Sequence, residues 1–90
     1  MADGIAKRTA MKYVYLLQST SSPNQRYIGI TDNLNNRLDN HNSGGSPHTA
    51  KFRPWKVIVA IRFEDHDKAV AFEKYLKSGS GRAFANKHLW

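Results

Sequence analysis

The chain has 90 residues, of which 40% are hydrophobic and 11% aromatic, a size and composition that suit one small globular domain with a single core. It has no cysteine, which excludes disulfide bridges, thiolate metal sites and a cysteine nucleophile. The 14 lysines and arginines exceed the 7 aspartates and glutamates, and the net charge of +7 favours nucleic acid as the partner over a basic surface without a specific role.

Residues 1–11 show no hydrophobic periodicity, and we expect a flexible arm in which Lys7 and Arg8 contact phosphate. The remaining residues, 12–90, are predicted to form one domain. The sequence shows no long apolar run and no signal-peptide core, so we expect a cytoplasmic protein without a membrane partner, one that could act at the nucleoid.

Two segments rich in β-formers, "YVYLLQ" (13–18) and "RYIGIT" (26–31), are separated by a polar turn and predict a β-hairpin. Alternation of side chains along the strands lets the hairpin bring Tyr15 and Tyr27 together, although tyrosines in strands are usually ordinary β-formers. Gly29 weakens a strand interior and indicates either a bulge or a close approach of the backbone by a ligand.

The next segment predicts a helix that begins at Thr31 or Asp32 and ends near Ser43. At about 100° per residue, Leu34, Leu38 and His41 share one face and Arg37 flanks it. An arginine there matches phosphate oxygens, and a histidine can exchange a proton near neutral pH. The ordinary alternative is that Arg37 pairs with Asp32 or Asp39 and that His41 bonds a carbonyl near the helix end.

The loop that follows contains "HTAKFRPWK" (48–56), which mixes basic and aromatic residues and is a candidate for substrate contact. In the alternative interpretation, Phe52 and Trp55 simply pack over the sheet edge. The strand at 55–63, "WKVIVAIRF", is apolar on both faces, which predicts a central position in the sheet.

The segment 64–79 predicts a helix that ends at Gly79, and 80–90 predicts a short helix capped by Ser80. Glu73 lies on the apolar stripe of the first of these helices. A carboxylate there needs a cation, a metal or a position at the rim, where Lys77 is the ordinary partner. The order ββαβαα predicts an α/β (α+β) domain in two layers, with a small three-stranded sheet that we expect to be antiparallel.

The tyrosine hydroxyls, Arg37, His41 and Glu73 are predicted to converge where the hairpin and the two long helices meet. Together they could hydrolyse a phosphodiester: Glu73 would hold a divalent cation such as Mg²⁺, Arg37 would neutralise phosphoryl charge, and a tyrosine or His41 would take a proton from water. A single carboxylate is a weak metal site, so the substrate phosphate would have to complete the coordination.

The same residues resemble the GIY-YIG nuclease superfamily. The two signature elements are "YVY" (13–15) and "YIG" (27–29), and the arginine, the helical glutamate and the asparagine of the family match Arg37, Glu73 and Asn86. The match covers nearly the whole chain. At the position of His41, relatives carry tyrosine or histidine.

The resemblance implies a small sheet flanked by helices and a DNA-cutting activity with one divalent cation, Mg²⁺ or Mn²⁺, bound by Glu73. Tyr15 and Tyr27 would position or activate water, Arg37 would bind phosphate and Asn86 would give polar support. The general base is open between Tyr27 and His41.

The sequence departs from the family pattern at two positions, since Tyr13 replaces the first signature glycine and Ile30 stands where some repair nucleases have a lysine. We also expect no added DNA-binding or partner-binding module of the kind that larger relatives use.

We therefore predict a metal-dependent DNA endonuclease that acts on branched or damaged DNA in repair or recombination. The first alternative is a non-catalytic nucleic-acid-binding module with the same fold and basic surface, which Ile30 favours, and the second is a structural interaction protein. Basic side chains of the 48–56 loop and of the last two helical segments are expected to contact the DNA: Lys51, Arg53, Lys56, Lys74, Lys77 and Arg82.

Overall fold

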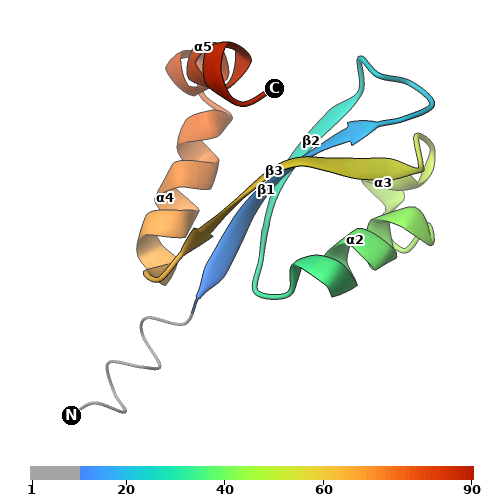
Figure 1. Cartoon of the computed structure of the whole chain (residues 1–90), viewed down its shortest axis with the longest axis horizontal. Coiled ribbons are helices and arrows are strands. Elements are labelled where there is room, and N and C mark those ends of the chain that lie inside the picture. Colours follow the sequence, from blue (N-terminus) through green and yellow to red (C-terminus); the bar gives the residue numbers. More distant parts are fainter. Residues whose placement is uncertain (1–10) are drawn as a thin grey trace.

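A three-stranded antiparallel sheet with helices around it forms the domain, in the order ββαβαα that the sequence predicts (Figure 1). The computed structural model describes residues 11–90, so nearly all of the predicted arm, with Lys7 and Arg8, lies outside the described residues. A short helix in the loop before the third strand was not predicted. The elements are β1 (Lys12–Ser19), β2 (Arg26–Thr31), α2 (Leu34–Asn42), α3 (Pro47–Ala50), β3 (Trp55–Phe63), α4 (His66–Leu76) and α5 (Gly79–His88).

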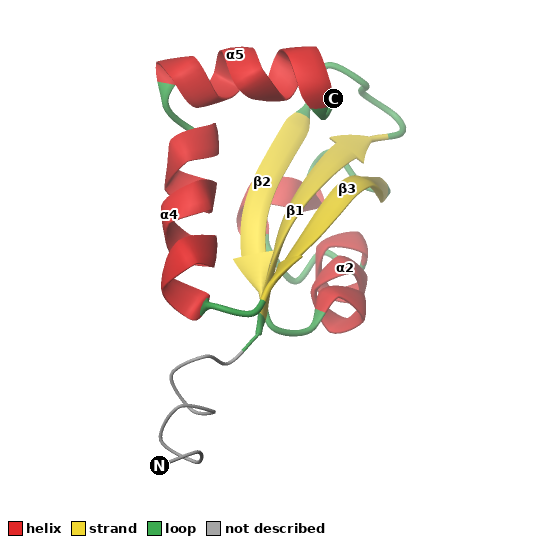
Figure 2. Ribbon diagram, turned by 60° about the vertical axis from the view of Figure 1, so that its left-hand side comes forward, coloured by secondary structure: helices red, strands yellow, loops and turns green. Residues whose placement is uncertain are grey.

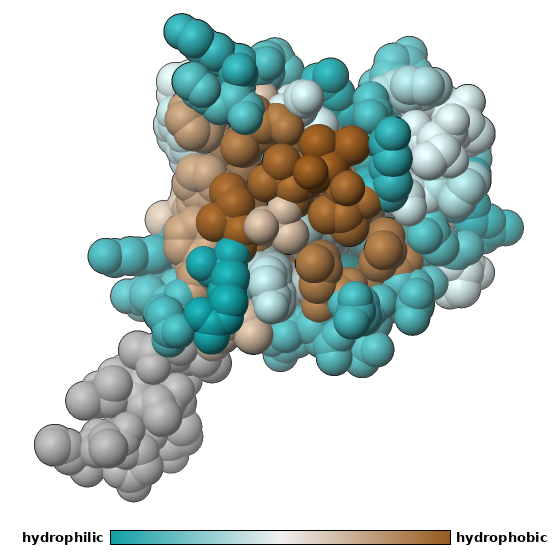
Figure 3. All heavy atoms as spheres, in the orientation of Figure 1, coloured by the Kyte–Doolittle hydropathy of each residue, from teal (hydrophilic) through white to brown (hydrophobic). Residues whose placement is uncertain are grey.

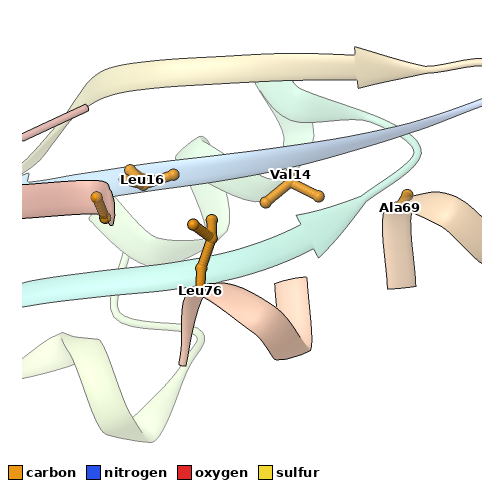
Figure 4. Close-up of a cluster of buried hydrophobic side chains, with 5 residues drawn as sticks. Val14, Leu16, Ala69 and Leu76 are labelled. Atoms are coloured by element: carbon orange, nitrogen blue, oxygen red, sulfur yellow. The ribbon is translucent and has the colours of Figure 1, made fainter. Parts of the chain in front are cut away.

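The central strand β1 is buried on both faces, so the sheet separates two apolar clusters. Val14 and Leu16 pack with Ala69 and Leu76 of α4 and with Ala85 of α5 (Figure 4). The other face of β1 packs against α2 and the segment that follows it. Helices therefore cover both faces, and the expected two-layer arrangement is wrong: the domain has three layers.

The strand β3 lies at an edge of the sheet, because the strand order is β2-β1-β3. The prediction that it is central is therefore wrong. Its apolar residues face two directions because each face of this sheet has its own helical layer: Val57 packs on the α2 side and Phe63 on the α4 side. Several of the other β3 side chains stay half-exposed, and Figure 3 shows apolar atoms gathered where β3 crosses the molecule.

Two helix starts differ from the prediction. Asn33 caps α2, since its side chain accepts the N–H of Asn36 at 3.1 Å, while Thr31 bonds the N–H of Asn33. Ser78, rather than Ser80, caps α5 by accepting the N–H of Gly81 at 3.2 Å. In both cases several residues that can cap a helix lie close together in the sequence. Only the path of the backbone decides which of them aligns with the free N–H groups.

Two helix ends also bear on the prediction. The helix α2 ends at Asn42 with Ser43 as its C-cap, as expected, but α4 stops at Leu76 and Gly79 is the first residue of α5.

Over residues 11–90, no helix combines the length and the apolar character needed to cross a membrane.

Candidate active site

The hairpin brings the two signature tyrosines together on the α2 side of the sheet, as predicted. The rings of Tyr15 and Tyr27 have centroids 6.1 Å apart, and Tyr15 is paired with Gly29 across the strands. A Cβ built at Gly29 would collide with the hydroxyl end of Tyr15 and lie 2.9 Å from Tyr27 Cε2. The glycine is thus needed because a side chain of the protein itself covers it; the strand irregularity lies elsewhere, between Leu16 and Leu17.

The imidazole of His41 points inward from α2 and is 1% exposed. Its Nε2 lies 3.0 Å from the hydroxyl of Tyr15, and its ring meets Tyr27 edge-on at a centroid distance of 4.9 Å. Leu34 and Leu38 of the same helix pack in this cluster. His41 therefore bonds a side chain of the sheet, and the alternative in which it bonds a carbonyl near the helix end is wrong.

A third buried residue, Thr49 of α3, holds the other side of the His41 ring. Its Oγ1 lies 2.7 Å from His41 Nδ1, and the Thr49 hydroxyl donates to the carbonyl of Ser46 at 3.4 Å. We assign the single proton of that hydroxyl to the Ser46 carbonyl, so that Nδ1 of His41 donates to Thr49 and Nε2 accepts from Tyr15. The three side chains form one directed chain from Tyr15 through His41 to Thr49.

Tyr15 and His41, the two titratable residues that this hydrogen-bond chain joins, are both held neutral. Burial raises the pKa of Tyr15 to about 12, and the nearby Tyr27 adds to the rise while Arg37 opposes it. Burial also lowers the pKa of His41, and the positive charge of Arg37 lowers it further. At neutral pH the pair is therefore a phenol that donates to an uncharged imidazole.

Arg37 lies beside this buried pair, close enough to affect the pKa of both Tyr15 and His41. It is exposed, and it lines a hollow of about 380 Å³ with residues 31–33, which precede α2, and with Asn36 and Asn40 of that helix. Among residues 11–90 it makes no ion pair, because Asp32 pairs with Lys12 at 3.8 Å and no pair involves Asp39. The alternative in which Arg37 pairs with Asp32 or Asp39 is therefore wrong, and the guanidinium of Arg37 is available to an anion.

Glu73 lies at the rim of the other cluster, with a side chain 15% exposed. Its Oε2 lies 2.5 Å from Nζ of Lys77, so the ordinary rim pair that the sequence allows is present. In the described part of the chain, no group of three or more His, Asp or Glu side chains could bind a metal. No hydrogen bond or ion pair in that part joins Glu73 to the tyrosines, Arg37 or His41.

A cleft of about 490 Å³ is lined both by Tyr27 and by Lys77, the partner of Glu73. The cleft lies between the start of β2 and the ends of α4 and α5, and Figure 2 shows the C-terminus beside the start of β2. Asn86 lines it too, and its Oδ1 accepts from Nη1 of Arg26 at 3.1 Å. Arg26 also lies over the ring of Trp90 at 4.6 Å.

The predicted DNA-contact loop divides into packed and exposed residues. Trp55 is 5% exposed and its Nε1 donates to the Thr49 carbonyl at 2.8 Å, while Phe52 packs in the same cluster, which confirms the packing interpretation for both aromatics. All six basic residues predicted to contact DNA are exposed: Lys51, Arg53, Lys56, Lys74, Lys77 and Arg82. Their role stays a prediction.

Sequence reasoning missed Thr49 and the Arg26–Trp90 pair. Thr49 had one signal, its place in a loop of mixed basic and aromatic residues, but nothing linked it to His41. No periodicity relates residues 26 and 90, so only the fold shows that they meet.

Residues 11–87 match the model of the family described as the GIY-YIG catalytic domain. The chain belongs to the GIY-YIG family. This confirms the superfamily resemblance, and the sheet flanked by helices agrees with it.

The chain is also similar to proteins named structure-specific endonuclease subunit SLX1. It is 41% identical to that of Debaryomyces hansenii and 38% identical to that of Yarrowia lipolytica, in each case over 71% of this chain. The homologue in Giardia intestinalis is 32% identical over 68% of the chain. The chain spans only 18–25% of the length of these relatives.

Proposed function

We propose that this domain hydrolyses phosphodiester bonds of DNA, and that its substrates are branched molecules. The observation that carries the proposal is the cluster in which β1, β2 and α2 bring together Tyr15, Tyr27, His41 and the exposed Arg37, which makes no ion pair with any described residue. The net charge of +7 supports an anionic polymer as substrate. The relatives named structure-specific endonuclease support the choice of branched DNA.

Arg37 would bind the phosphate and neutralise charge that develops on it during the reaction. Tyr27, half-buried beside the cluster and also on the wall of the cleft, would take the proton from the attacking water. His41 is a poorer choice, because it is 1% exposed and both ring nitrogens are already bonded. Tyr15 and His41 would instead hold Tyr27 in place.

The divalent cation that the family implies would bind at Glu73. Mg²⁺ takes one or two carboxylates, keeps several waters and completes its shell with substrate phosphate, so one rim carboxylate fits it. The pair with Lys77 shows that this carboxylate already attracts a cation. When bound, Mg²⁺ or Mn²⁺ would polarise the phosphate and stabilise the leaving oxygen. Asn86 would act from the cleft by holding Arg26.

The six exposed basic residues would contact the DNA backbone on either side of the cut, in the cytoplasm or at the nucleoid, for repair or recombination. They lie in the loop before β3, on the C-terminal half of α4 and on α5. Such contacts position the protein on the duplex without reading its sequence.

The non-catalytic alternative drew support from Ile30, which stands where some relatives have a lysine. In the structure Ile30 packs against the cluster on the α4 side, while Tyr27 and Gly29 face α2. A lysine at this position would therefore lie on the opposite face of the sheet from the buried Tyr15–His41 pair and would add no charge beside it. The catalytic interpretation does not depend on Ile30.

The test is a nicking assay on supercoiled DNA and on a branched junction, with Mg²⁺ or Mn²⁺ against chelator. We expect metal-dependent cutting that Glu73→Gln abolishes while DNA binding stays within about twofold. Glu64→Gln is the matched control, because Glu64 is an exposed glutamate that pairs with Arg62 at the end of β3. Binding without cutting on any substrate would overturn the proposal in favour of the module.

A further inference from the structure

The cleft between β2, α4 and α5 contains more recognition groups than the proposed reaction uses. Of its described lining residues, only Tyr27 belongs to the cluster of Tyr15 and His41; the others with polar or aromatic side chains are Arg26, Lys77, Arg82, Asn86 and Trp90. We propose that this cleft binds one unpaired nucleotide of the DNA, beside the phosphodiester to be cut. This inference rests on the proposed function and assigns a substrate feature to it.

The charge of the cleft suits a phosphate. Arg26, Lys77 and Arg82 are exposed cations, and no aspartate or glutamate is among the described lining residues. Lys77 is held by Glu73 and Arg26 by Asn86, but Arg82 makes no ion pair with any described residue. Arg82 is therefore the side chain most available to a phosphate oxygen.

The aromatic part of the cleft suits a base. Trp90 is half-buried with the guanidinium of Arg26 over its ring at 4.6 Å, and Asn86 fixes that guanidinium through a 3.1 Å hydrogen bond. Flat guanidinium and indole groups are surfaces on which single-stranded bases stack. Asn86 still has an unbonded Nδ2 within the described residues, a donor for the edge of a base.

The nucleotide must be unpaired for two physical reasons. The cleft volume of about 490 Å³ is that of a small-ligand site, for which about 300–1,000 Å³ is typical, and not that of a groove for a duplex. In addition, a base can stack on Trp90 and Arg26 only if no neighbouring base pair covers that face. Tyr27 on the same wall then places the unpaired nucleotide next to the proposed site of cutting.

The test is tryptophan fluorescence, measured in the Glu73→Gln background with chelator so that no DNA is cut. Two DNA hairpins with the same stem are compared, one with a short single-stranded end and one blunt. Trp90 is the reporter, since Trp55 is 5% exposed and packed in the core. We expect the overhang to quench the fluorescence and to bind at least about fivefold tighter than the blunt hairpin, the lower end of the gain from stacking one base.

Two variants complete the test. Trp90→Ala should remove both the quenching and the preference for the overhang. Because Trp90 also packs against the core, Arg82→Ala is the second variant: it should weaken overhang binding more than Lys87→Ala, a matched loss of charge on the same helix outside the cleft lining.

Equal affinity for the two hairpins, or equal effects of Arg82→Ala and Lys87→Ala, would overturn the inference. These outcomes leave the nicking assay unaffected, so a protein that cuts DNA without preferring the overhang would keep the proposed function and lose only the nucleotide site. Conversely, if the overhang quenches the fluorescence and binds more tightly but the protein cuts no DNA, the nucleotide site stands and the proposed nuclease function fails.

Discussion

Replacing Thr49 by valine should destabilise the domain measurably. Valine keeps the volume but removes the Oγ1 that lies 2.7 Å from His41 Nδ1, so the N–H assigned to that nitrogen of the buried His41 loses its only partner among the described residues. Leaving a buried donor unsatisfied costs about 1–3 kcal/mol. This is a large share of the roughly 5–15 kcal/mol that stabilises a typical domain, and each kcal/mol should lower Tm by about 4–8 °C at this size.

The assay is equilibrium unfolding in urea, followed by circular dichroism, with Thr20→Val as the control. The hydroxyl of Thr20 also donates to a carbonyl, that of Pro54 at 3.1 Å, but it is exposed to water, so its loss should change the free energy of unfolding by no more than about 0.5 kcal/mol. A Thr49→Val protein that unfolds at the same urea concentration as the control would refute the directed hydrogen-bond chain.

Four further predictions follow from the same geometry. Because the folded pKa of His41 is lowered, stability should fall in acid titrations as pH drops below about 6.5. Because the pKa of Tyr15 is raised from 10.0 to about 12, stability should also fall by about 2–3 kcal/mol as the pH rises through that range, measured by urea unfolding at alkaline pH. Gly29→Ala should displace the Tyr15 ring and reduce both stability and cutting; unchanged values would show that the ring moves freely. Lys77→Gln should tighten Mn²⁺ binding in calorimetry by freeing Glu73, and an unchanged affinity would place the cation elsewhere.

The element types could be predicted from the sequence because they depend on local patterns. Alternating residues identify β1 and β2, and the spacing of Ala69 and Leu76 identifies α4. The position of β3 could not be predicted in this way. A strand apolar on both faces indicates only that both faces are covered, and in this three-layer domain an edge strand meets that condition as well as a central one.

The candidate site was predictable to the same extent. Strand parity places Tyr15 and Tyr27 on one face, and the helical repeat places His41 beside Leu34 and Leu38. These rules predict which way a side chain points from its own strand or helix, but they do not predict which residues of other elements it contacts. Glu73 shows the limit: its position on the apolar stripe was clear, but the pattern allowed a metal, a cation or the rim, and the structure contains the rim pair with Lys77.

The structure also explains why position 41 can hold a histidine or, as the family resemblance implies, a tyrosine. Tyr15 is fully buried, so its hydroxyl needs an acceptor, and His41 provides one through Nε2 at 3.0 Å. A positive charge on that ring is disfavoured by burial and by Arg37, so the position requires a neutral acceptor of aromatic shape and does not require an acid or base. A tyrosine hydroxyl meets the same requirement. The buried side of α2 therefore holds the tyrosines, and the exposed Arg37 carries the charge that is available to an anion.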